Sequence, residues 1–112
     1  MRIYKILARR DWEAACNAGV YEGSEIDRAD GFIHFSTAVQ AQETARRHFR
    51  GQAGLLVLEV EAEDLGGALK WEPSRGGDLF PHLYGALDPA LVRGLDEAPL
   101  DADGAPLIGP LA

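Results

Sequence analysis

The sequence predicts an α+β fold: a small single domain with a mostly antiparallel sheet and two main helices. Two helical patterns fall in the first half of the chain, and the rest consists mainly of short strand patterns. No strand–helix–strand rhythm continues past about residue 60, which argues against a Rossmann-type sheet. The length of 112 residues suits one domain with a modest core.

The first two elements are a strand and a short helix. Residues 2–8, RIYKILA, alternate in the manner of a strand. The helix that follows ends at Gly19, a residue type common just past a helix end. Trp12, Ala15 and Cys16 share one face of this helix at helical spacing. We therefore expect Cys16 to be a small buried side chain.

The middle of the chain contains the clearest strand pattern. Residues 20–31 are polar and are expected to form a loop, long enough to be either a flap or a short irregular strand. Residues 32–36, FIHFS, are expected to form a second strand. A second helix is expected from about residue 38 to residue 50, stopped by Gly51. The apolar run at residues 55–61, LLVLEVE, is typical of a central strand.

The second half is predicted to contain extended segments joined by loops. A short strand closes at Pro73, and a further strand or mixed turn precedes Pro99. The remaining extended segment spans residues 79–87. We expect residues 1–98 to form the globular domain and residues 99–112 a loosely structured C-terminal tail.

Charge argues against long nucleic acids as partners. The net charge is −7 and the pI is near 4.8, whereas affinity for such polymers depends on neutralising phosphates with Lys and Arg. The few basic residues are uneven: Arg46, Arg47 and Arg50 cluster with His48, and Arg75 stands in a glycine-rich loop. Local positive sites on an acidic body suit a small anionic molecule as partner.

Cysteine count and hydropathy set the expected compartment. The single cysteine rules out an internal disulfide framework and a four-cysteine zinc site. No stretch approaches the roughly 20 apolar residues of a membrane span, and no signal-like apolar core follows the N-terminus. We expect a cytoplasmic protein without membrane contact; the oligomeric state is left open.

The strand at residues 32–36 carries a polar pattern. A period of two places Phe32, His34 and Ser36 on one face and Ile33 and Phe35 on the other, which is the expected core face. His34 is then either a strand residue hydrogen-bonded to a neighbouring strand or the edge of a working site. The spacing does not choose between them.

The helix that follows begins with a capping pattern. Thr37 is the expected N-cap, and Gln40 stands three residues later, as in a capping box. This arrangement would leave Ser36 free for another role. The unpaired backbone N–H groups of a first helical turn favour anions, so the helix start is a candidate anion site.

A second candidate segment spans residues 70–85, KWEPSRGGDLFPHLYG. Its SRGG loop offers a hydroxyl, a guanidinium and a flexible backbone from Ser74, Arg75, Gly76 and Gly77, which together can cradle a phosphate or a carboxylate. Such loops are common, so this signal is weak by itself.

Downstream of that loop, His82 and Tyr84 repeat the two-residue spacing and share one strand face. Glu72 lies upstream and can pair with Arg75 or with a histidine. The structural alternative makes Arg75 a surface ion pair, His82 a loop filler and Trp71 part of the core.

The third histidine, His48, lies late in the second helix, where a packed histidine is more common than a ligand. The three histidines show neither the HxH nor the HExxH spacing. We predict no metal site, although a zinc-dependent hydrolase remains the third alternative.

The motifs IYKIL, DGFIHFST, HFRGQ and LKWEPSRGGDLFPHLYG together resemble a small uncharacterised bacterial family, the domain of unknown function numbered 952, over about residues 2 to 95. The resemblance implies an ADP-ribosyltransferase-like fold, as in ADP-ribosylating toxins and RNA 2′-phosphotransferases. His34 and Ser36 resemble the early-strand His-x-Ser/Thr element that contacts NAD or ADP-ribose in those enzymes. The tyrosine and late glutamate of the toxin triad have no clear counterparts, Tyr84 and Glu97 being the nearest. Of the phosphotransferase arginines, only Arg75 resembles a candidate.

Two functions follow from these patterns. The first is a transferase, or its degenerate relative, with a pocket for a nucleotide or an ADP-ribose-like ligand such as NAD. The second is a binding or interaction module that uses the same cleft without chemistry. The candidate catalytic residues are His34, His82 and Glu72, and the candidate ligand-binding residues are Ser36, Thr37, Ser74, Arg75, Gly76, Gly77 and Tyr84.

Overall fold

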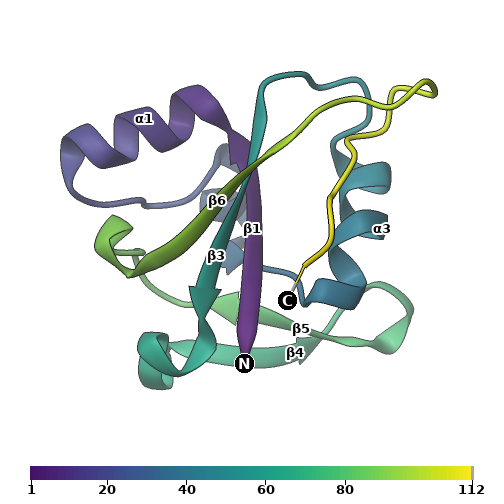
Figure 1. Ribbon diagram of the computed structural model, residues 1–112. Helices are drawn as coiled ribbons and strands as arrows, with labels where there is room; N and C mark the ends of the chain where they lie inside the picture. Colours follow the sequence, from purple (N-terminus) through teal and green to yellow (C-terminus); the bar gives the residue numbers. More distant parts are fainter. Residues whose placement is uncertain (112) are drawn as a thin grey trace.

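Two three-stranded antiparallel sheets form the frame of the protein (Figure 1). The computed structural model describes residues 1–111, apart from the side chain of Arg75. The first sheet has the order β1-β3-β6 and the second the order β2-β5-β4. The strands are β1 (Arg2–Ala8), β2 (Ile33–His34), β3 (Leu55–Glu61), β4 (Leu69–Pro73), β5 (Leu79–Leu83) and β6 (Val92–Ala98).

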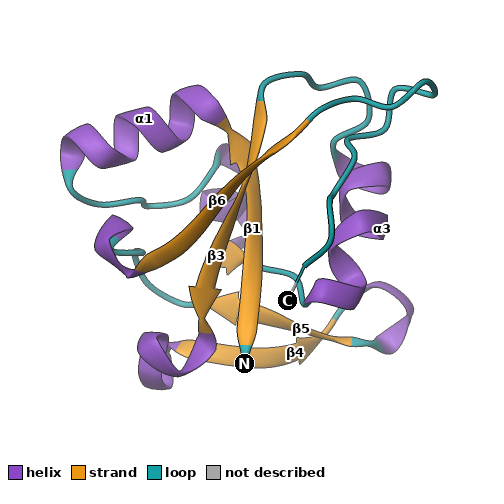
Figure 2. Ribbon diagram, viewed as in Figure 1, coloured by secondary structure: helices purple, strands orange, loops and turns teal. Residues whose placement is uncertain are grey.

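Helices cover the first sheet on both sides (Figure 2). In the view shown, α1 and α3 lie on opposite sides of β1, and each contacts that strand. Short 3-10 turns lead into β4, β5 and β6. The helices are α1 (Arg9–Ala18), α2 (Glu25–Asp30) and α3 (Ala38–His48), and the 3-10 segments are η1 (Ala62–Ala68), η2 (Arg75–Gly77) and η3 (Pro89–Leu91).

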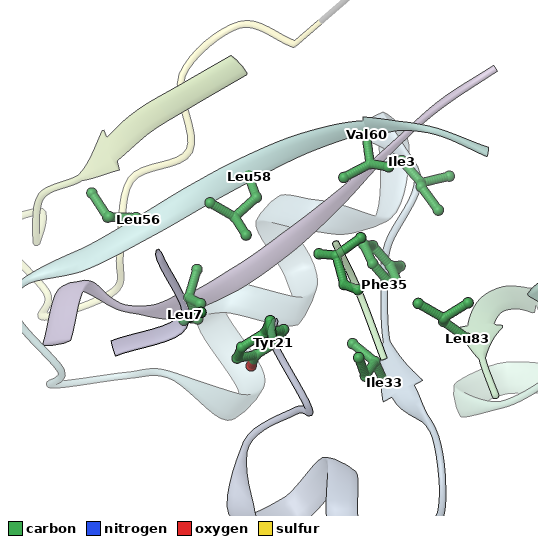
Figure 3. Packing of buried hydrophobic residues seen from close by; sticks show 11 residues of the cluster. Ile3, Leu7, Tyr21, Ile33, Phe35, Leu56, Leu58, Val60 and Leu83 are labelled. Carbon is green, nitrogen blue, oxygen red and sulfur yellow. The ribbon is translucent and has the colours of Figure 1, made fainter. Parts of the chain in front are cut away.

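The alternation of β1 divides the core into two clusters. Ile3 and Leu7 pack on one face with residues of β3, β2 and β5 (Figure 3). Tyr4 and Ile6 point to the other face, where they pack against Ala45 of α3. Burial of such apolar side chains contributes about 1.5–3 kcal/mol each relative to exposure. β1 therefore packs against core on both faces.

The two sheets meet where the chain leaves β2. The Tyr4 N–H donates to the Ser36 carbonyl at 2.8 Å, and the Ser36 N–H donates to the Tyr4 carbonyl at 2.8 Å. This bridge joins β1 to the chain just after β2. His34 thus lies two residues before the junction between the sheets.

The fold class is confirmed: the domain is a small α+β unit with antiparallel sheets and several helices. The strand expected at residues 55–61 is the centre of its sheet. The strands form two sheets rather than one. The domain boundary at residue 98 stays a prediction, although Gln42 hydrogen-bonds both Pro106 and Ile108 of the C-terminal segment.

The predictions for residues 20–31 and for Cys16 were wrong. The expected loop at residues 20–31 contains α2, because Ser24 and Asp27 form a capping box and Gly31 ends the helix in a left-handed conformation. Cys16 is exposed rather than buried. Consecutive residues point about 100° apart on a helix, and Ala15 takes the buried position of α1.

Within residues 1–111, no helix has both the length and the apolar character needed to cross a membrane.

Candidate functional site

His34 and His82 lie side by side on neighbouring strands. They are cross-strand partners in the β2–β5 pair, and their ring centroids are 5.6 Å apart in an edge-on arrangement. Phe32 stacks on the His82 ring with centroids 4.0 Å apart and contacts the His34 ring at 4.6 Å. The sequence placed these histidines in two separate segments, and the strand pairing brings them together.

The alternation predicted for residues 32–36 accounts for this placement. Ile33 and Phe35 are buried in the core, while Phe32 and His34 project from the opposite face. The Phe35 N–H donates to the Pro81 carbonyl at 3.0 Å, which extends the contact between the two segments. The His34 side chain is 35 % exposed, whereas that of His82 is 6 % exposed.

A buried carboxylate holds the His34 ring. The His34 Nδ1 atom lies 2.6 Å from Asp27 Oδ1, and the Lys5 Nζ atom lies 2.8 Å from Asp27 Oδ2. Both Lys5 and Asp27 are almost completely buried. On the outer side, His34 Nε2 lies 3.0 Å from Oδ2 of the half-exposed Asp30. One helix, α2, thus supplies a carboxylate to each nitrogen of the ring.

The Lys5–Asp27 pair is electrostatically coupled to this histidine. Burial favours the neutral form of Asp27, but the hydrogen bond with His34 and the charge of Lys5 outweigh it and hold the pKa of Asp27 well below its usual range. Burial lowers the pKa of the Lys5 ammonium, against the attraction of Asp27. Such a buried pair persists because each charge would be costly alone.

The Tyr21 hydroxyl also faces Asp27 but makes no hydrogen bond within the described residues. Its hydroxyl oxygen is buried and has no hydrogen-bond partner in the described part of the chain. Burial and the negative charge of Asp27 raise the pKa of the Tyr21 hydroxyl. Tyr21 therefore stays neutral beside the carboxylate at ordinary pH.

Glu72 forms the second histidine–carboxylate pair. Its Oε1 atom lies 2.8 Å from His82 Nδ1 and accepts a hydrogen bond of 2.8 Å from the Tyr84 hydroxyl. The His82 contact, together with that from Tyr84, lowers the pKa of Glu72, and the pKa of Tyr84 is raised by the same carboxylate. Of the two partners that the sequence allowed for Glu72, the structure shows the histidine.

One cavity of about 1180 Å³ runs beside β1 between the α1–α2 segment and α3. Four of the predicted site residues line it: His34, Ser36, Ser74 and His82. Thr37, Glu72, Gly76, Gly77 and Tyr84 do not contribute to its lining. The Arg75 side chain lies outside the described part of the structure.

The start of α3 has the predicted capping box. Thr37 Oγ1 accepts from the Gln40 N–H at 3.3 Å, and Gln40 Oε1 accepts from the Thr37 N–H at 3.0 Å. Ser36 is not free as expected, because its hydroxyl donates to Thr44 Oγ1 at 3.2 Å. Ser36 is hydrogen-bonded to β1 through its backbone and to α3 through its side chain.

The SRGG loop forms a closed turn. The Ser74 N–H donates to the Asp78 carbonyl at 2.9 Å, and the Gly77 N–H donates to the Ser74 carbonyl at 2.8 Å. Gly76 and Gly77 both have positive φ, which the absence of a Cβ permits. Two of the backbone donors expected to cradle an anion are thus used within the turn.

Sequence reasoning missed Lys5 and Asp27. A signal for Lys5 was present, since the period of two places it between Ile3 and Leu7 on an apolar strand face, where an unpaired charge would be costly. Ser24 followed three residues later by an acidic residue was a signal for a helix start. Neither signal shows that Asp27 reaches Lys5 and His34.

The described residues contain no group of three or more His, Cys, Asp or Glu side chains placed to hold a metal ion. His48 lines the same cavity as His34 and His82 but on α3.

Comparisons with known proteins give a family without an assigned activity. The model of the family described as "Protein of unknown function (DUF952)" matches residues 6–95. The crystal structure of protein CC0527 from Caulobacter crescentus is 57 % identical, covers 95 % of this chain and 93 % of its own, and has a TM-score of 0.93. The solution NMR structure of CC0527 is 58 % identical, covers 94 % of this chain and 90 % of its own, and has a TM-score of 0.84. No curated protein matches the chain.

Proposed function

Because the chain belongs to the family of proteins of unknown function called DUF952, we propose its function from the geometry of its own site: the cavity beside β1 binds a small anionic molecule of the nucleotide or ADP-ribose class. The observation that carries this proposal is the meeting of His34 and His82 at one cavity, each with its own carboxylate. Pockets that combine apolar walls with a few fixed polar groups are typical ligand sites.

In this proposal, His34 hydrogen-bonds a ribose hydroxyl and the loop of Ser74 and Arg75 lies nearest the phosphates. The position of Ser74 supports this arrangement because Ser74 lines the same cavity as His34. The partly buried Phe32 ring stacks on His82 and also contacts the His34 ring, which restrains both histidines. The ADP-ribosyltransferase-like fold belongs to the same proposal.

The chemistry would use the second pair. His82 with Glu72 is suited to move a proton as general acid or base, since a carboxylate on Nδ1 orients the imidazole. If NAD is the substrate, the bond between the ribose and the nicotinamide nitrogen breaks, nicotinamide leaves with the bonding electrons, and water or another nucleophile takes the ADP-ribosyl group.

The test is a titration of NAD, ADP-ribose and AMP followed by the ring NMR signals of His34 and His82. We expect both rings to shift at millimolar ligand or below, and the variants His34→Gln and His82→Gln to weaken binding by at least about tenfold. Arg93→Gln, on the exposed outer strand β6, is the matched control. Unmoved histidine signals at millimolar concentrations of all three compounds would refute the proposal.

A second candidate is a binding module without chemistry. It is favoured by the contacts of Glu72, whose Oε1 atom already accepts from both His82 and Tyr84. Nicotinamide release from NAD separates the two candidates: binding without release at high protein concentration supports the module, and release that Glu72→Gln abolishes supports the enzyme.

A further inference from the structure

The two carboxylates that hold His34 differ in how firmly they are fixed. Asp27, on Nδ1, has a side chain that is 2 % exposed, while Asp30, on Nε2, has one that is 49 % exposed. An ion pair at such an exposed position is weak because water solvates both partners. The inner contact is therefore permanent in the folded protein, and the outer one is readily displaced.

Four donors from three segments fix the Asp27 carboxylate. Lys5 Nζ and the Ser24 N–H contact Oδ2 at 2.8 and 2.9 Å. The ring Nδ1 and the backbone N–H of His34 contact Oδ1 at 2.6 and 3.2 Å. The carboxylate can neither rotate nor leave without uncovering the buried ammonium of Lys5, so it fixes the ring plane of His34.

This arrangement determines which nitrogen faces the ligand. Carboxylate oxygens only accept hydrogen bonds, so the contacts with Asp27 and Asp30 need a hydrogen on both ring nitrogens, with Nδ1 directed inward and Nε2 outward. The outward nitrogen lies beside the cavity, which both Asp30 and His34 line. At that position, the Asp30 carboxylate already accepts a hydrogen bond from Nε2–H.

We propose that Lys5 and Asp27 are positioning residues for His34, and that the Asp30 carboxylate occupies the place of an acceptor oxygen of the ligand. In the ligand class proposed above, that acceptor is a ribose hydroxyl oxygen, so this part rests on the proposed function. Binding then exchanges one His34 contact for another, and the Asp30 side chain moves into solvent.

The first arm of the test measures the outer contact. Asp30→Ala is expected to bind ADP-ribose about threefold to fivefold more tightly than the wild type, because a competing acceptor and one negative charge are removed. Glu25→Gln is the matched control: it removes one negative charge from the exposed side of the same helix, α2, without touching His34. Equal affinity changes in Asp30→Ala and Glu25→Gln, or a loss of affinity in Asp30→Ala, would overturn the role of Asp30.

The second arm measures the inner contacts in the ligand-free protein. Asp27→Asn alone strands the buried Lys5 charge and is prone to misfold, so the double variant Lys5→Met/Asp27→Asn, which removes both charges, is used. Two-bond proton–nitrogen spectra of the histidine rings report which nitrogen carries hydrogen. We expect a hydrogen on Nδ1 of His34 in the wild type and in Asp30→Ala, and a mixture of tautomers in the double variant.

The same spectra separate positioning from a merely structural role. Lys5→Arg keeps the charge and should keep the wild-type His34 signals, whereas the double variant should lose them and bind ADP-ribose at least about tenfold more weakly. A folded double variant with wild-type His34 signals would overturn the positioning role. If neither the wild type nor Asp30→Ala binds ADP-ribose, the proposed function and the role of Asp30 fail together, and the ring spectra still decide the roles of Lys5 and Asp27.

Discussion

His34 and His82 are paired across two strands, and each ring reaches a carboxylate from a different part of the chain. Asp27 comes from α2, which packs against β2, while Glu72 comes from β4 at the outer edge of the second sheet. The β2–β5 pairing therefore brings a carboxylate from α2 and a carboxylate from the edge strand β4 to two neighbouring histidines. Substituting either histidine tests whether its contacts stabilise the fold or are available to a ligand.

The two histidines should differ in their effect on stability. His34→Ala is expected to lower the free energy of unfolding by about 1 kcal/mol, because Asp27 keeps Lys5 and two backbone donors. His82→Ala removes a buried ring stacked on Phe32 and should cost about 2–3 kcal/mol. Urea unfolding of both variants measures the difference. A loss above about 2 kcal/mol for His34→Ala would make this residue structural.

Acid should destabilise the protein through Asp27. Its pKa is lowered in the folded state, so the stabilisation is fully present above the unfolded value near pH 4 and is lost as the pH falls toward the folded value. Urea midpoints from pH 5 to pH 2 should fall steeply in the wild type and less steeply in Lys5→Met/Asp27→Asn. Glu43, whose pKa is lowered to about 2 by Arg46 and Arg47 on the protein surface, is the control. Glu43→Gln should change the slope less because solvent screens its ion pairs, and an equal change would contradict the role given to burial.

The secondary structure was largely readable from sequence because its signals are local. The period of two in residues 2–8 and 55–61 and the capping box of Thr37 each act over a few residues, and the corresponding elements form as expected. The face of β2 that carries His34 was also predicted from alternation alone. The helix α2 was missed although its capping box is a local signal, because a six-residue helix is too short to be stable without packing.

The composition of the site was less predictable, because it depends on which strands pair. Nothing in the segments around His34 and His82 specifies that β2 and β5 are neighbours. Asp27 contacts Lys5 from a position 22 residues later in the chain, and such a contact follows from the path of the chain rather than from a motif. All the candidate catalytic and ligand-binding residues stay predictions, since no ligand contact tests them.

Tyr21 should make the protein sensitive to alkali. Burial, followed by the charge of Asp27, raises the pKa of its hydroxyl in the folded state. The folded protein therefore binds this proton more tightly than the unfolded chain, and stability falls as the pH rises above about 10. Tyr21→Phe removes a buried hydroxyl without a hydrogen bond, so it should be neutral or stabilising by up to about 1 kcal/mol at pH 7 and lose less stability between pH 9 and pH 11. Thermal unfolding across this range checks it; a parallel loss in both proteins would contradict it.

The capping box of α3 should be measurable by itself. Thr37→Ala removes the side-chain acceptor for the Gln40 N–H and should cost about 1 kcal/mol of unfolding free energy. Thr37→Ser keeps that acceptor and should cost much less. An ADP-ribose affinity that falls about tenfold in Thr37→Ala but not in Thr37→Ser would place this helix start in the ligand site as well. Equal stability of the two variants would contradict the capping role.

Gly23 should be among the most sensitive glycines because it lies against Asp27. Its φ is +101°, and a Cβ at this position would lie 2.7 Å from the Asp27 Cβ. Gly23→Ala is therefore expected to cost about 2–3 kcal/mol, from the unfavourable backbone conformation together with displacement of Asp27. Gly19→Ala is the control, since Gly19 has a φ of +78° with open space around its Cβ position and should cost only about 1 kcal/mol. The ring NMR signals of His34 should move in Gly23→Ala and stay in place in Gly19→Ala. Equal costs in the two variants would show that the contact with Asp27 is relieved without moving the carboxylate that holds His34.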